Sequence, residues 1–568
     1  MGKNAQVYHF NAPGCLTLKA LANGTTFSFS KRATAGDMYF SADGGSNWYK
    51  TSEVTIPAVN NNDTVMFVGD MTPNTSSSTY GIGTFSSTGN FEVQGNVMSL
   101  LFLDNFSDKV SLSGKNYVFY GLFLECSNLT SAQNMTLPAT TLSTWCYYRM
   151  FRSCTNLTMP PSSLPATNGV DSCYMYMFAL CSNLTTTPTI AMTKNAHFAY
   201  MFFGCRTLTE TPILNIQSGV FSANSMFNGC TNLQNIRFTV NGSLQGDLTQ
   251  MFYGCTSLTT IPTGFFTSNT QKQMNNHFRS MFSRCTSIIT LQTNLLPYTT
   301  LSTTSAYSEM FKECTGLTNV PNLPAPTLTD SCYMNMFYGC TSLVTIPANL
   351  FNSVHTLNVY CFCQMFYGCT SLTTLPTLPS ATLTTACFSG MFNECRSLSS
   401  IPNNYLPYTT LAQSCYQSMF SACPLTSLPN NLLPATTLAN VCYEMMFRDC
   451  TKLATVPSDL LPATTLTKEC YYGMFMNCTS LVTAPDLPAT TLVNTCYANM
   501  FRDCSKLNYI KAMFTTTPGS SYTQYWVSNV ANTGTFVKNS AATWTNTFGS
   551  STIPKDSSHK WTVTTASS

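Results

Sequence analysis

Charged side chains are scarce in this chain of 568 residues, since Asp, Glu, Lys and Arg together make up 9% of it. Average soluble domains carry roughly 25% of such residues. The formal net charge is +3, and no stretch gathers the Lys and Arg that nucleic acid or an anionic membrane would require. We therefore expect a neutral surface rich in Thr, Ser and Asn, and no nucleic acid as a partner.

Long apolar runs are missing as well. A helix that spans a membrane needs about 18 or more consecutive apolar residues, and the sequence has no such run. After Lys3 the N-terminal segment is polar, and Pro13 interrupts it before the apolar core of a signal peptide develops. Gln6 occupies the position where a myristoylation signal has Ser or Thr. Membrane insertion, a standard export signal and a lipid anchor are therefore not expected.

Sequence motifs of catalysis are not found. There is no GxSxG elbow, no phosphate-binding loop, no dinucleotide fingerprint and no EF-hand loop. The five His share no local signature, and the 23 Asp and Glu are few for this length. A pair of glycosidase carboxylates needs no fixed spacing, so that alternative stays open. We expect a protein that is not an enzyme and has no catalytic residues, cofactor or metal ion.

The informative feature of the chain is a repeat. Between residues 122 and 504, a hydrophobic pair that ends in Phe is followed fifteen times by a Cys three positions later. The phenylalanines are Phe123, Phe151, Phe178, Phe202, Phe227, Phe252, Phe282, Phe311, Phe337, Phe366, Phe392, Phe420, Phe447, Phe475 and Phe501. The cysteines are Cys126, Cys154, Cys181, Cys205, Cys230, Cys255, Cys285, Cys314, Cys340, Cys369, Cys395, Cys423, Cys450, Cys478 and Cys504. Successive phenylalanines are 24 to 30 residues apart, and such a period is typical of solenoids, whose repeats bury their apolar faces against each other.

A second cysteine series lies five residues before the Phe. Its members are Cys146, Cys173, Cys332, Cys361, Cys387, Cys415, Cys442, Cys470 and Cys496, and Cys15 and Cys363 belong to neither series. Cysteines locked to a repeat stack as ladders, in which neighbours seldom have the dihedral angle of a disulfide. We interpret them as structural ladders of free buried thiols, with a disulfide framework as the alternative. His197 shares the second ladder with Cys173, but a ladder brings two ligands together where zinc needs four.

One regular repeat is CYYGMFMNCTSLVTAPDLPATTL, from Cys470 to Leu492. In CYxxMFxxC, apolar or small residues at offsets 0, 1, 4, 5 and 8 fit one face of a two-turn helix. TSLVTAP is typical of a short strand that ends at Pro485, and LPATTL of an extended return that points Leu492 to the core. We predict an α/β repeat, a solenoid with one short strand and one short helix in each unit.

Both ends of the chain lie outside the repeat. Residues 1–95 contain LTLKA, TFSFSK, DMYFSADGGSNWYK, SEVTIPAV and DTVMFVGD, which predict an N-terminal β domain. We expect about 15 repeats over residues 96–514. Residues 515–568 contain three Trp and the strand-like segments YWVSNV, GTFVKN and KWTVTT. Because the open end of a solenoid exposes its core, we predict a β-rich C-terminal cap there, with a separate recognition or oligomerisation module as the alternative.

The pattern Leu-x-x-Leu/Ile-Pro with Phe-x-x-Cys upstream resembles the leucine-rich repeats of the BspA-like surface proteins, a family of bacterial adhesins and host-contact proteins. It recurs in register over residues 120–510. The segments GIGTFSSTGNFEVQGNVMSLLF and GTFVKN also resemble sequences that accompany these repeats in gut Bacteroides and in the phages that infect them. The resemblance implies a leucine-rich-repeat solenoid with a binding surface, and it assigns no catalytic residues.

The second cysteine series is interrupted in the middle of the repeats. There, the position five residues before the Phe holds in turn His197, Ser222, Asp247, His277 and Ala306. One interpretation is a local change of curvature without functional consequence, since solenoids tolerate variation in loop length. The other is a binding patch, with His197, Ser222, Asp247 and His277 as its candidate residues.

We predict a non-catalytic recognition or structural protein on the surface of a particle. The first hypothesis is a phage virion component, a fibre or decoration protein that contacts a host-surface glycan or protein, because free thiols suit assembly in the cytoplasm. The alternative is a BspA-like adhesin on the bacterial cell surface. Exposed Tyr, Thr and Asn would supply the contacts. Other virion proteins and a second copy of the chain stay open as partners.

Overall fold

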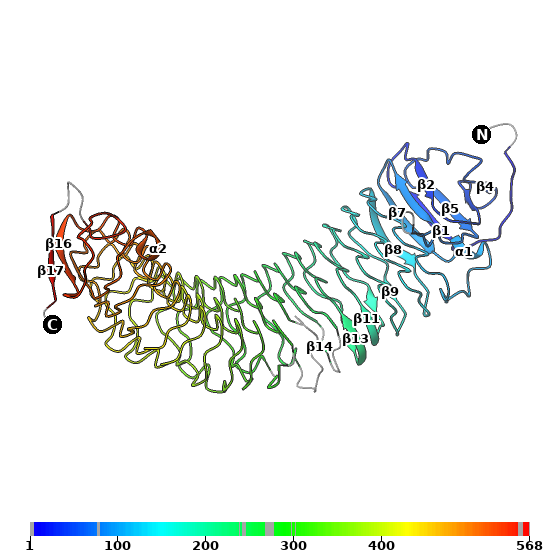
Figure 1. Ribbon diagram of the computed structural model, residues 1–568. Coiled ribbons are helices and arrows are strands. Elements are labelled where there is room, and N and C mark those ends of the chain that lie inside the picture. The colour runs from blue at the N-terminus through cyan, green and yellow to red at the C-terminus, as the bar shows by residue number, and fades with distance from the viewer. Residues whose placement is uncertain are drawn as a thin grey trace. The chain divides into compact units, whose positions relative to one another are not determined.

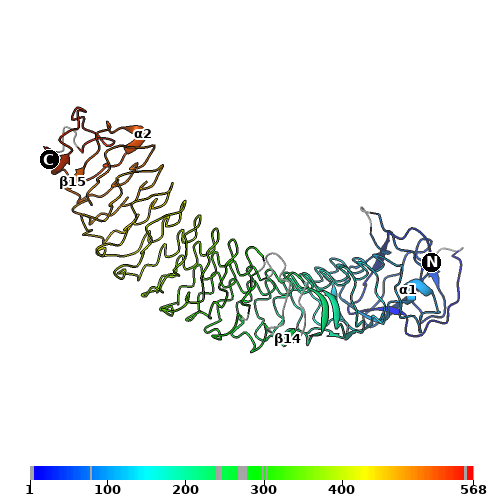
Figure 2. The same ribbon diagram turned by 60° about the horizontal axis from the view of Figure 1, so that its bottom comes forward.

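The computed structural model of the protein describes residues 5–76, 80–237, 239–240, 246–266, 278–296, 298–301, 303–554 and 560–566. The chain forms two compact units, Met1–Ile288 and Ile289–Ser568. Within each unit, successive coils of the chain lie side by side (Figure 1, Figure 2). The predicted solenoid is confirmed, while the three-domain division at residues 95 and 514 stays a prediction.

The first unit begins with paired strands. They are β1 (Leu16–Ala20), β2 (Phe27–Lys31), β3 (Met38–Ser41), β4 (Tyr49–Lys50), β5 (Thr64–Gly69), β6 (Gly83–Ser87), β7 (Phe91–Asn96) and β8 (Leu129–Thr136). A six-stranded sheet has the order β4-β3-β5-β1-β7-β8, and β2 pairs with β6 in a second sheet. The pair β7–β8 is parallel and the other pairs are antiparallel. Because β8 follows Cys126 of the first repeat, this sheet continues into the first coil.

Most of the strands predicted near the N-terminus are present, and one is not. SEVTIPAV, residues 52–59, forms a turn followed by irregular chain. Pro57 removes a backbone donor in this segment, which is unfavourable in a strand that pairs on both sides.

The segment around each Phe-x-x-Cys motif is a row of overlapping β-turns. The described residues form α-helix only in α1 (Ser99–Phe102) and α2 (Ser520–Thr523). Along a row every fourth residue has a positive φ, as at Arg149 (56°) and Ser153 (62°). A positive φ at the third residue is typical of type II β-turns and is incompatible with an α-helix. The short helix predicted for each repeat is therefore wrong, although the leucine-rich-repeat solenoid is correct.

Backbone amides along a row alternate between two kinds of hydrogen bond. Met150 N–H donates within its own row, to Tyr147 O at 3.2 Å. Phe151 N–H donates to Met177 O of the next coil at 2.9 Å, and Tyr147 N–H donates to Cys173 O of that coil at 3.1 Å. Of two successive amides, one therefore closes a turn and the other joins two coils. The buried N–H and C=O groups are thus hydrogen-bonded without a helix or a continuous sheet.

The sequence pattern could not separate a helix from this turn row. Buried residues come in pairs that repeat every four positions, as in Cys470 and Tyr471, then Met474 and Phe475, then Cys478. A helix of about 3.6 residues per turn places nearly the same residues on one face over a single motif. So short a window does not distinguish the two periods.

Beyond β8, regular strands are few among the described residues of the repeats before β15. They are β9 (Ser163–Leu164), β10 (Thr189–Ile190), β11 (Lys194–His197), β12 (Asn215–Ile216), β13 (Ser218–Ser222) and β14 (Thr239–Val240). They pair in parallel, β9 with β10, β11 with β13 and β12 with β14. Some other segments predicted as strands meet the next coil at single bridges, such as that between Thr483 and Tyr509.

The phenylalanines form a stack within each unit. In the first unit, neighbouring ring centroids from Phe85 to Phe282 are 5.3 to 5.6 Å apart. In the second unit, those from Phe311 to Phe501 are 5.6 to 6.1 Å apart. The rings are buried and nearly parallel, an offset stacking that aromatic pairs favour. Since Phe85 belongs to β6, the N-terminal strands supply the first ring.

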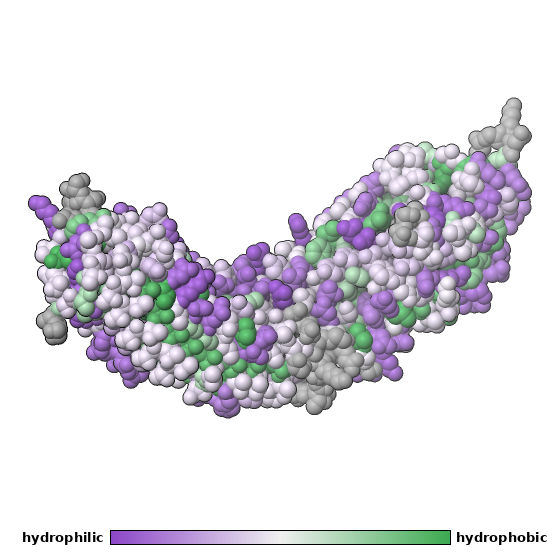
Figure 3. Space-filling model, viewed as in Figure 1, coloured by the Kyte–Doolittle hydropathy of each residue, from purple (hydrophilic) through white to green (hydrophobic). Residues whose placement is uncertain are grey.

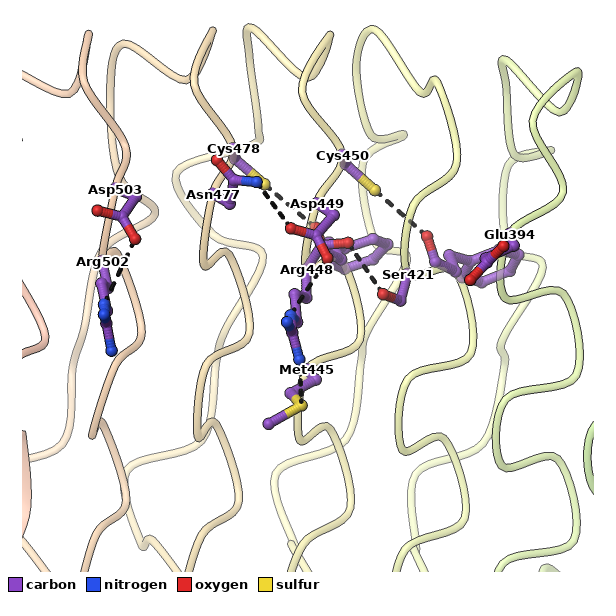
Figure 4. A network of polar contacts seen from close by, with 12 residues as sticks. Glu394, Ser421, Met445, Arg448, Asp449, Cys450, Asn477, Cys478, Arg502 and Asp503 are labelled. Atoms are coloured by element: carbon purple, nitrogen blue, oxygen red, sulfur yellow. Dashed lines mark hydrogen bonds and ion pairs between the residues drawn. The ribbon is translucent and has the colours of Figure 1, made fainter.

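The thiols of the first cysteine series bond the backbone of the preceding coil. Cys478 Sγ–H donates to Phe447 O at 3.1 Å, and Cys450 Sγ–H donates to Phe420 O at 3.2 Å (Figure 4). Members of the series from Cys126 to Cys504 make this bond, at 2.7 to 3.3 Å. A small apolar group with a weak donor suits this buried position.

All 26 cysteines are free thiols, and 25 of them are buried. Burial raises the pKa of the ladder thiols, to about 12 at both Cys369 and Cys423. Thiolates are the reactive species and are therefore scarce in the ladders at neutral pH. Cys363, which belongs to neither series, is half-buried.

The C-terminal end of the second unit is closed by tryptophans and a parallel sheet. The sheet comprises β15 (Tyr509–Ala512), β16 (Thr533–Lys538) and β17 (Lys560–Thr565). The indole N–H groups of Trp526, Trp544 and Trp561 donate to backbone oxygens at 2.7 to 3.3 Å, and all three side chains are buried. The ring of Trp526 lies 6.1 Å from that of Phe501, at the end of the phenylalanine stack.

Two of the three strands predicted at this end are correct. GTFVKN and KWTVTT fall in β16 and β17. YWVSNV, residues 525–530, instead continues the turn row, since Phe501 N–H donates to Trp526 O at 2.8 Å. Its aromatic and β-branched residues point inward at the same positions as in the other turn rows. Over so short a segment, this pattern resembles the alternation of a strand.

Replacing Phe337 or Phe366 by Ala should lower the free energy of unfolding by about 3–5 kcal/mol, because each change leaves a cavity inside the stack. Urea unfolding and hydrogen exchange of the flanking coils measure this loss. Ser400→Ala, on an exposed side chain, is the control and should change stability by less than about 0.5 kcal/mol. Parent-like unfolding of either Phe variant would show that these rings do not form the core.

Cys363 should react first with a water-soluble thiol reagent, and the other cysteines should react after unfolding. Its labelling should accelerate as the pH rises toward 11, because burial raises its pKa to about 11 and the thiolate is the reactive form. Mass spectrometry of the labelled chain measures this, and Cys363→Ser should lose the native-state label. Fast labelling of several cysteines, or intact disulfides, would contradict the ladder of buried thiols.

Candidate recognition surface

Outward positions of the coils carry hydroxyl groups. In several coils, an exposed threonine seven residues after the Phe donates its hydroxyl to the carbonyl at the same position of the preceding coil. Thr185 Oγ1 donates to Thr158 O at 3.0 Å, and Thr373 Oγ1 donates to Val344 O at 3.1 Å. Much of the face seen in Figure 3 has intermediate hydropathy, with hydrophilic and hydrophobic residues scattered over it, some of them in small groups. These threonines are exposed and uncharged, in agreement with the neutral polar surface expected from composition.

The tyrosines that follow the second cysteine series face inward. They are Tyr147, Tyr174, Tyr333, Tyr416, Tyr443, Tyr471 and Tyr497, and all are buried. A different set is partly exposed in the second unit, where the rings of Tyr338 and Tyr367 stack at 4.6 Å. Tyr367 Oη donates to Glu394 Oε1 at 2.7 Å, and this hydrogen bond lowers the pKa of Glu394. These tyrosines belong to a network within the protein surface.

An aromatic strip, buried at Tyr148 and partly exposed at Tyr120, Tyr176 and Tyr200, runs over the first coils of the first unit. Tyr120 stacks on Tyr148 with centroids 5.1 Å apart, and Tyr176 stacks on Tyr200 at 4.5 Å. The guanidinium of Arg149 lies 4.8 Å from the Tyr148 ring and 5.5 Å from the Tyr176 ring. Because neighbouring groups cover these ring faces, the strip contributes mainly to packing between coils.

The irregular repeats place three candidate residues in one row. His197 ends β11 and pairs with Ser222 of β13, and Asp247 lies one coil further along. His197 and Ser222 are half-buried and Asp247 is exposed, whereas the cysteines that hold this position elsewhere are buried. His277 lies outside the described residues. The substitutions therefore open this row to solvent, and a binding role for it stays a prediction.

The environment of His197 favours the neutral form of its imidazole. Burial lowers the pKa of His197, and Asp171 acts in the opposite direction. The two side chains are 3.9 Å apart, from Nδ1 to Oδ1, and that of Asp171 is 67% exposed. A pair this exposed contributes little to stability or binding.

A carboxyl pair lies on neighbouring coils of the second unit. Burial raises the pKa of Glu444, and the nearby Glu469 raises it further. Gln417 Nε2 donates to Glu444 Oε2 at 2.8 Å, and Lys468 lies 3.7 Å from Glu469. These side chains are held by partners within the protein, and neither carboxyl lines the cavities described below.

Within the described ranges, no three or more His, Cys, Asp or Glu side chains are placed to hold a metal ion. No helix in the same ranges is both long enough and apolar enough to span a membrane.

A cavity opens in the second unit where a short coil lies between two longer ones. Phe366 and Phe392 are 26 residues apart, whereas the preceding coil, from Phe337, has 29 and the following coil, to Phe420, has 28. The extra residues lie in the return segments, because the turn rows have a fixed length. The short coil therefore recedes between its neighbours on the side of these segments.

This cavity, which we call the notch, has a volume of about 710 Å³. Residues 378–383 of the short coil form its floor, and His355 and residues 407–410 of the two longer coils form its walls. None of the lining residues is Asp, Glu, Lys or Arg. A second cavity of about 220 Å³ shares Leu378 and Pro407 with the notch.

The notch has no distinctive signature in the sequence. Its lining consists of the same Leu, Pro, Ala and Thr residues that every repeat contains, so no residue type marks it. The order of the Phe spacings, 29, 26 and then 28 residues, does not mark it either, because the spacings from Phe282 to Phe366 run 29, 26 and 29.

Comparisons with known proteins bear on the family. The profile of the BspA type leucine-rich repeat region (six copies) matches residues 116–226, 200–321, 300–454 and 416–523. No curated protein matches the chain.

Some solved structures are similar. One is a leucine-rich repeat protein from Bacteroides ovatus, with 18% identity, a TM-score of 0.37, and coverage of 77% of this chain and 92% of that chain. A TLR13–ssRNA13 complex has 12% identity, a TM-score of 0.19 and coverage of 73% and 55%. The plant peptide hormone receptor RGFR1 in complex with RGF2 has 12% identity, a TM-score of 0.13 and coverage of 73% and 69%. Likeness at this level carries no argument about function.

The family assignment rests on the extent of the profile match. The four overlapping segments run from residue 116 to residue 523, which is well over half of the chain. They cover the Phe-x-x-Cys motifs on which the resemblance was based. The chain belongs to the BspA-type leucine-rich repeat family.

Proposed function

We propose that this chain is a non-catalytic recognition protein on the surface of a phage particle, a fibre or decoration protein that contacts a host-surface glycan or protein. BspA-like leucine-rich repeat proteins are typically surface-exposed, and leucine-rich repeat proteins are generally non-catalytic binding scaffolds. The exposed hydroxyls of the coils support a recognition role, since they offer hydrogen bonds along a neutral surface.

The observation that carries the assignment to a virion is the state of the cysteines. All 26 are free thiols, whereas proteins that fold in an oxidising compartment usually keep disulfides. A virion protein folds in the cytoplasm of the infected cell and leaves it at lysis. Once folded, its thiols are protected by burial and by raised pKa values, as at Cys369.

The second candidate function is that of an adhesin on the bacterial cell surface. Membership of the BspA-type family favours it, and the same repeat surface would serve it. The two candidates differ in where the chain is found.

Mass spectrometry of purified virions should find this chain at a constant ratio to the capsid protein across the fractions of a density gradient, because a structural component cosediments with the particle. The outer-membrane fraction of uninfected host cells is the control and should lack the chain. Detection in the membrane fraction alone would contradict the virion assignment and support the adhesin.

A further inference from the structure

We propose that the notch binds a neutral oligosaccharide of the host surface. This inference rests on the proposed recognition function, to which it adds a place on the molecule and a class of ligand. It follows from the charge, the hydrogen-bonding groups, the apolar surfaces and the size of the notch.

The lining of the notch carries no charged side chain, apart from the imidazole of His355 when it is protonated. A charged ligand that loses water on entering a cavity needs an opposite charge to compensate, and the lining has no carboxylate, ammonium or guanidinium group to provide one. Sialylated or sulfated glycans, nucleic acid and charged peptides are therefore poor ligands for this cavity. A neutral ligand suits it.

Hydroxyl groups are abundant around the notch. Ser380 and Thr382 on the floor, and Thr409 and Thr410 on the wall, are exposed. Each hydroxyl both donates and accepts hydrogen bonds, as the hydroxyls of a sugar do. In addition, the backbone N–H of Thr382 has no hydrogen-bond partner among the described residues. The notch thus offers several small hydrogen-bonding groups within one concave surface.

Apolar surfaces lie among these polar groups. The ring of Tyr408 and the side chains of Pro379 and Pro407 line the notch. Tyr408 Oη donates to Pro379 O at 2.5 Å, and this bond fixes the ring on the wall between two coils. A fixed aromatic side chain loses little entropy on binding, and the apolar C–H faces of a sugar pack well on such surfaces.

The size and shape of the notch also favour a short glycan over a protein. Its volume of about 710 Å³ lies within the range of small-ligand sites, roughly 300–1,000 Å³. The adjoining cavity of about 220 Å³ leaves room for a further sugar unit. Stable protein interfaces bury roughly 1,200–2,000 Å² and centre on Trp, Tyr or Arg anchors. Tyr408 alone among the lining residues is of these types.

The experiment measures binding of the full-length chain to an array of neutral, sialylated and sulfated oligosaccharides. The test variant is Thr382→Trp, which fills the notch from an exposed position of its floor. Thr465→Trp is the matched control, because Thr465 is exposed, precedes a buried Leu in the same motif and does not line the notch. His355→Ala, on an exposed residue of the wall, is a second test variant in case the Trp substitution disturbs folding.

The parent and Thr465→Trp should bind neutral oligosaccharides equally, while Thr382→Trp and His355→Ala should lose at least about tenfold in affinity. If both test variants bind glycans like the parent, the notch is not the site, although the recognition function stands. If the parent binds charged glycans instead, the inference about the ligand class is overturned. If the parent binds host-surface protein and no glycan on the array, the inference also fails, and if it binds neither, the recognition function fails with it.

Discussion

The structure depends on hydrogen bonds between neighbouring coils. In each turn row, alternate amides donate to the next coil, as Phe151 does to Met177 at 2.9 Å. The bonds repeat at fixed positions, so they hold successive coils in register and bring equivalent side chains above one another. The stacked phenylalanines and the cysteine ladders follow from this register. Stability is therefore spread over contacts between neighbours, as expected for a solenoid.

The cysteines show how a repeated contact selects a residue type. The position three residues after the Phe needs a small group that fills the core and can also approach the Phe carbonyl of the preceding coil. A thiol meets both requirements, since it packs as an apolar group and donates weakly, as Cys478 does to Phe447 at 3.1 Å. The first cysteine series is thus explained by packing, and the free thiols also bear on the compartment in which the chain folds.

Sequence predicted the architecture well because the evidence for it is repeated many times. Fifteen Phe-x-x-Cys motifs in register indicate a stack whatever the local backbone conformation is. The predicted local conformation was wrong in part. Paired inward residues such as Met474 and Phe475 fit both a helix and a turn row over one motif. For the candidate site, sequence singled out a row of atypical residues from His197 to Asp247, which the structure shows as open to solvent. The notch was missed because its residues are ordinary and its origin lies in the lengths of three successive coils.

The notch shows that a solenoid can acquire a cavity when residues are removed from a return segment. Its core residues are those of the other coils, and it lies where one return segment is two or three residues shorter than its neighbours. An insertion or deletion in a return segment leaves the phenylalanine stack and the turn rows unchanged, because both lie elsewhere in the coil. Small length changes in different repeats could thus move a pocket along the molecule, or remove it, without rebuilding the core. The cavities and protrusions of such a surface would evolve independently of the stability of the fold.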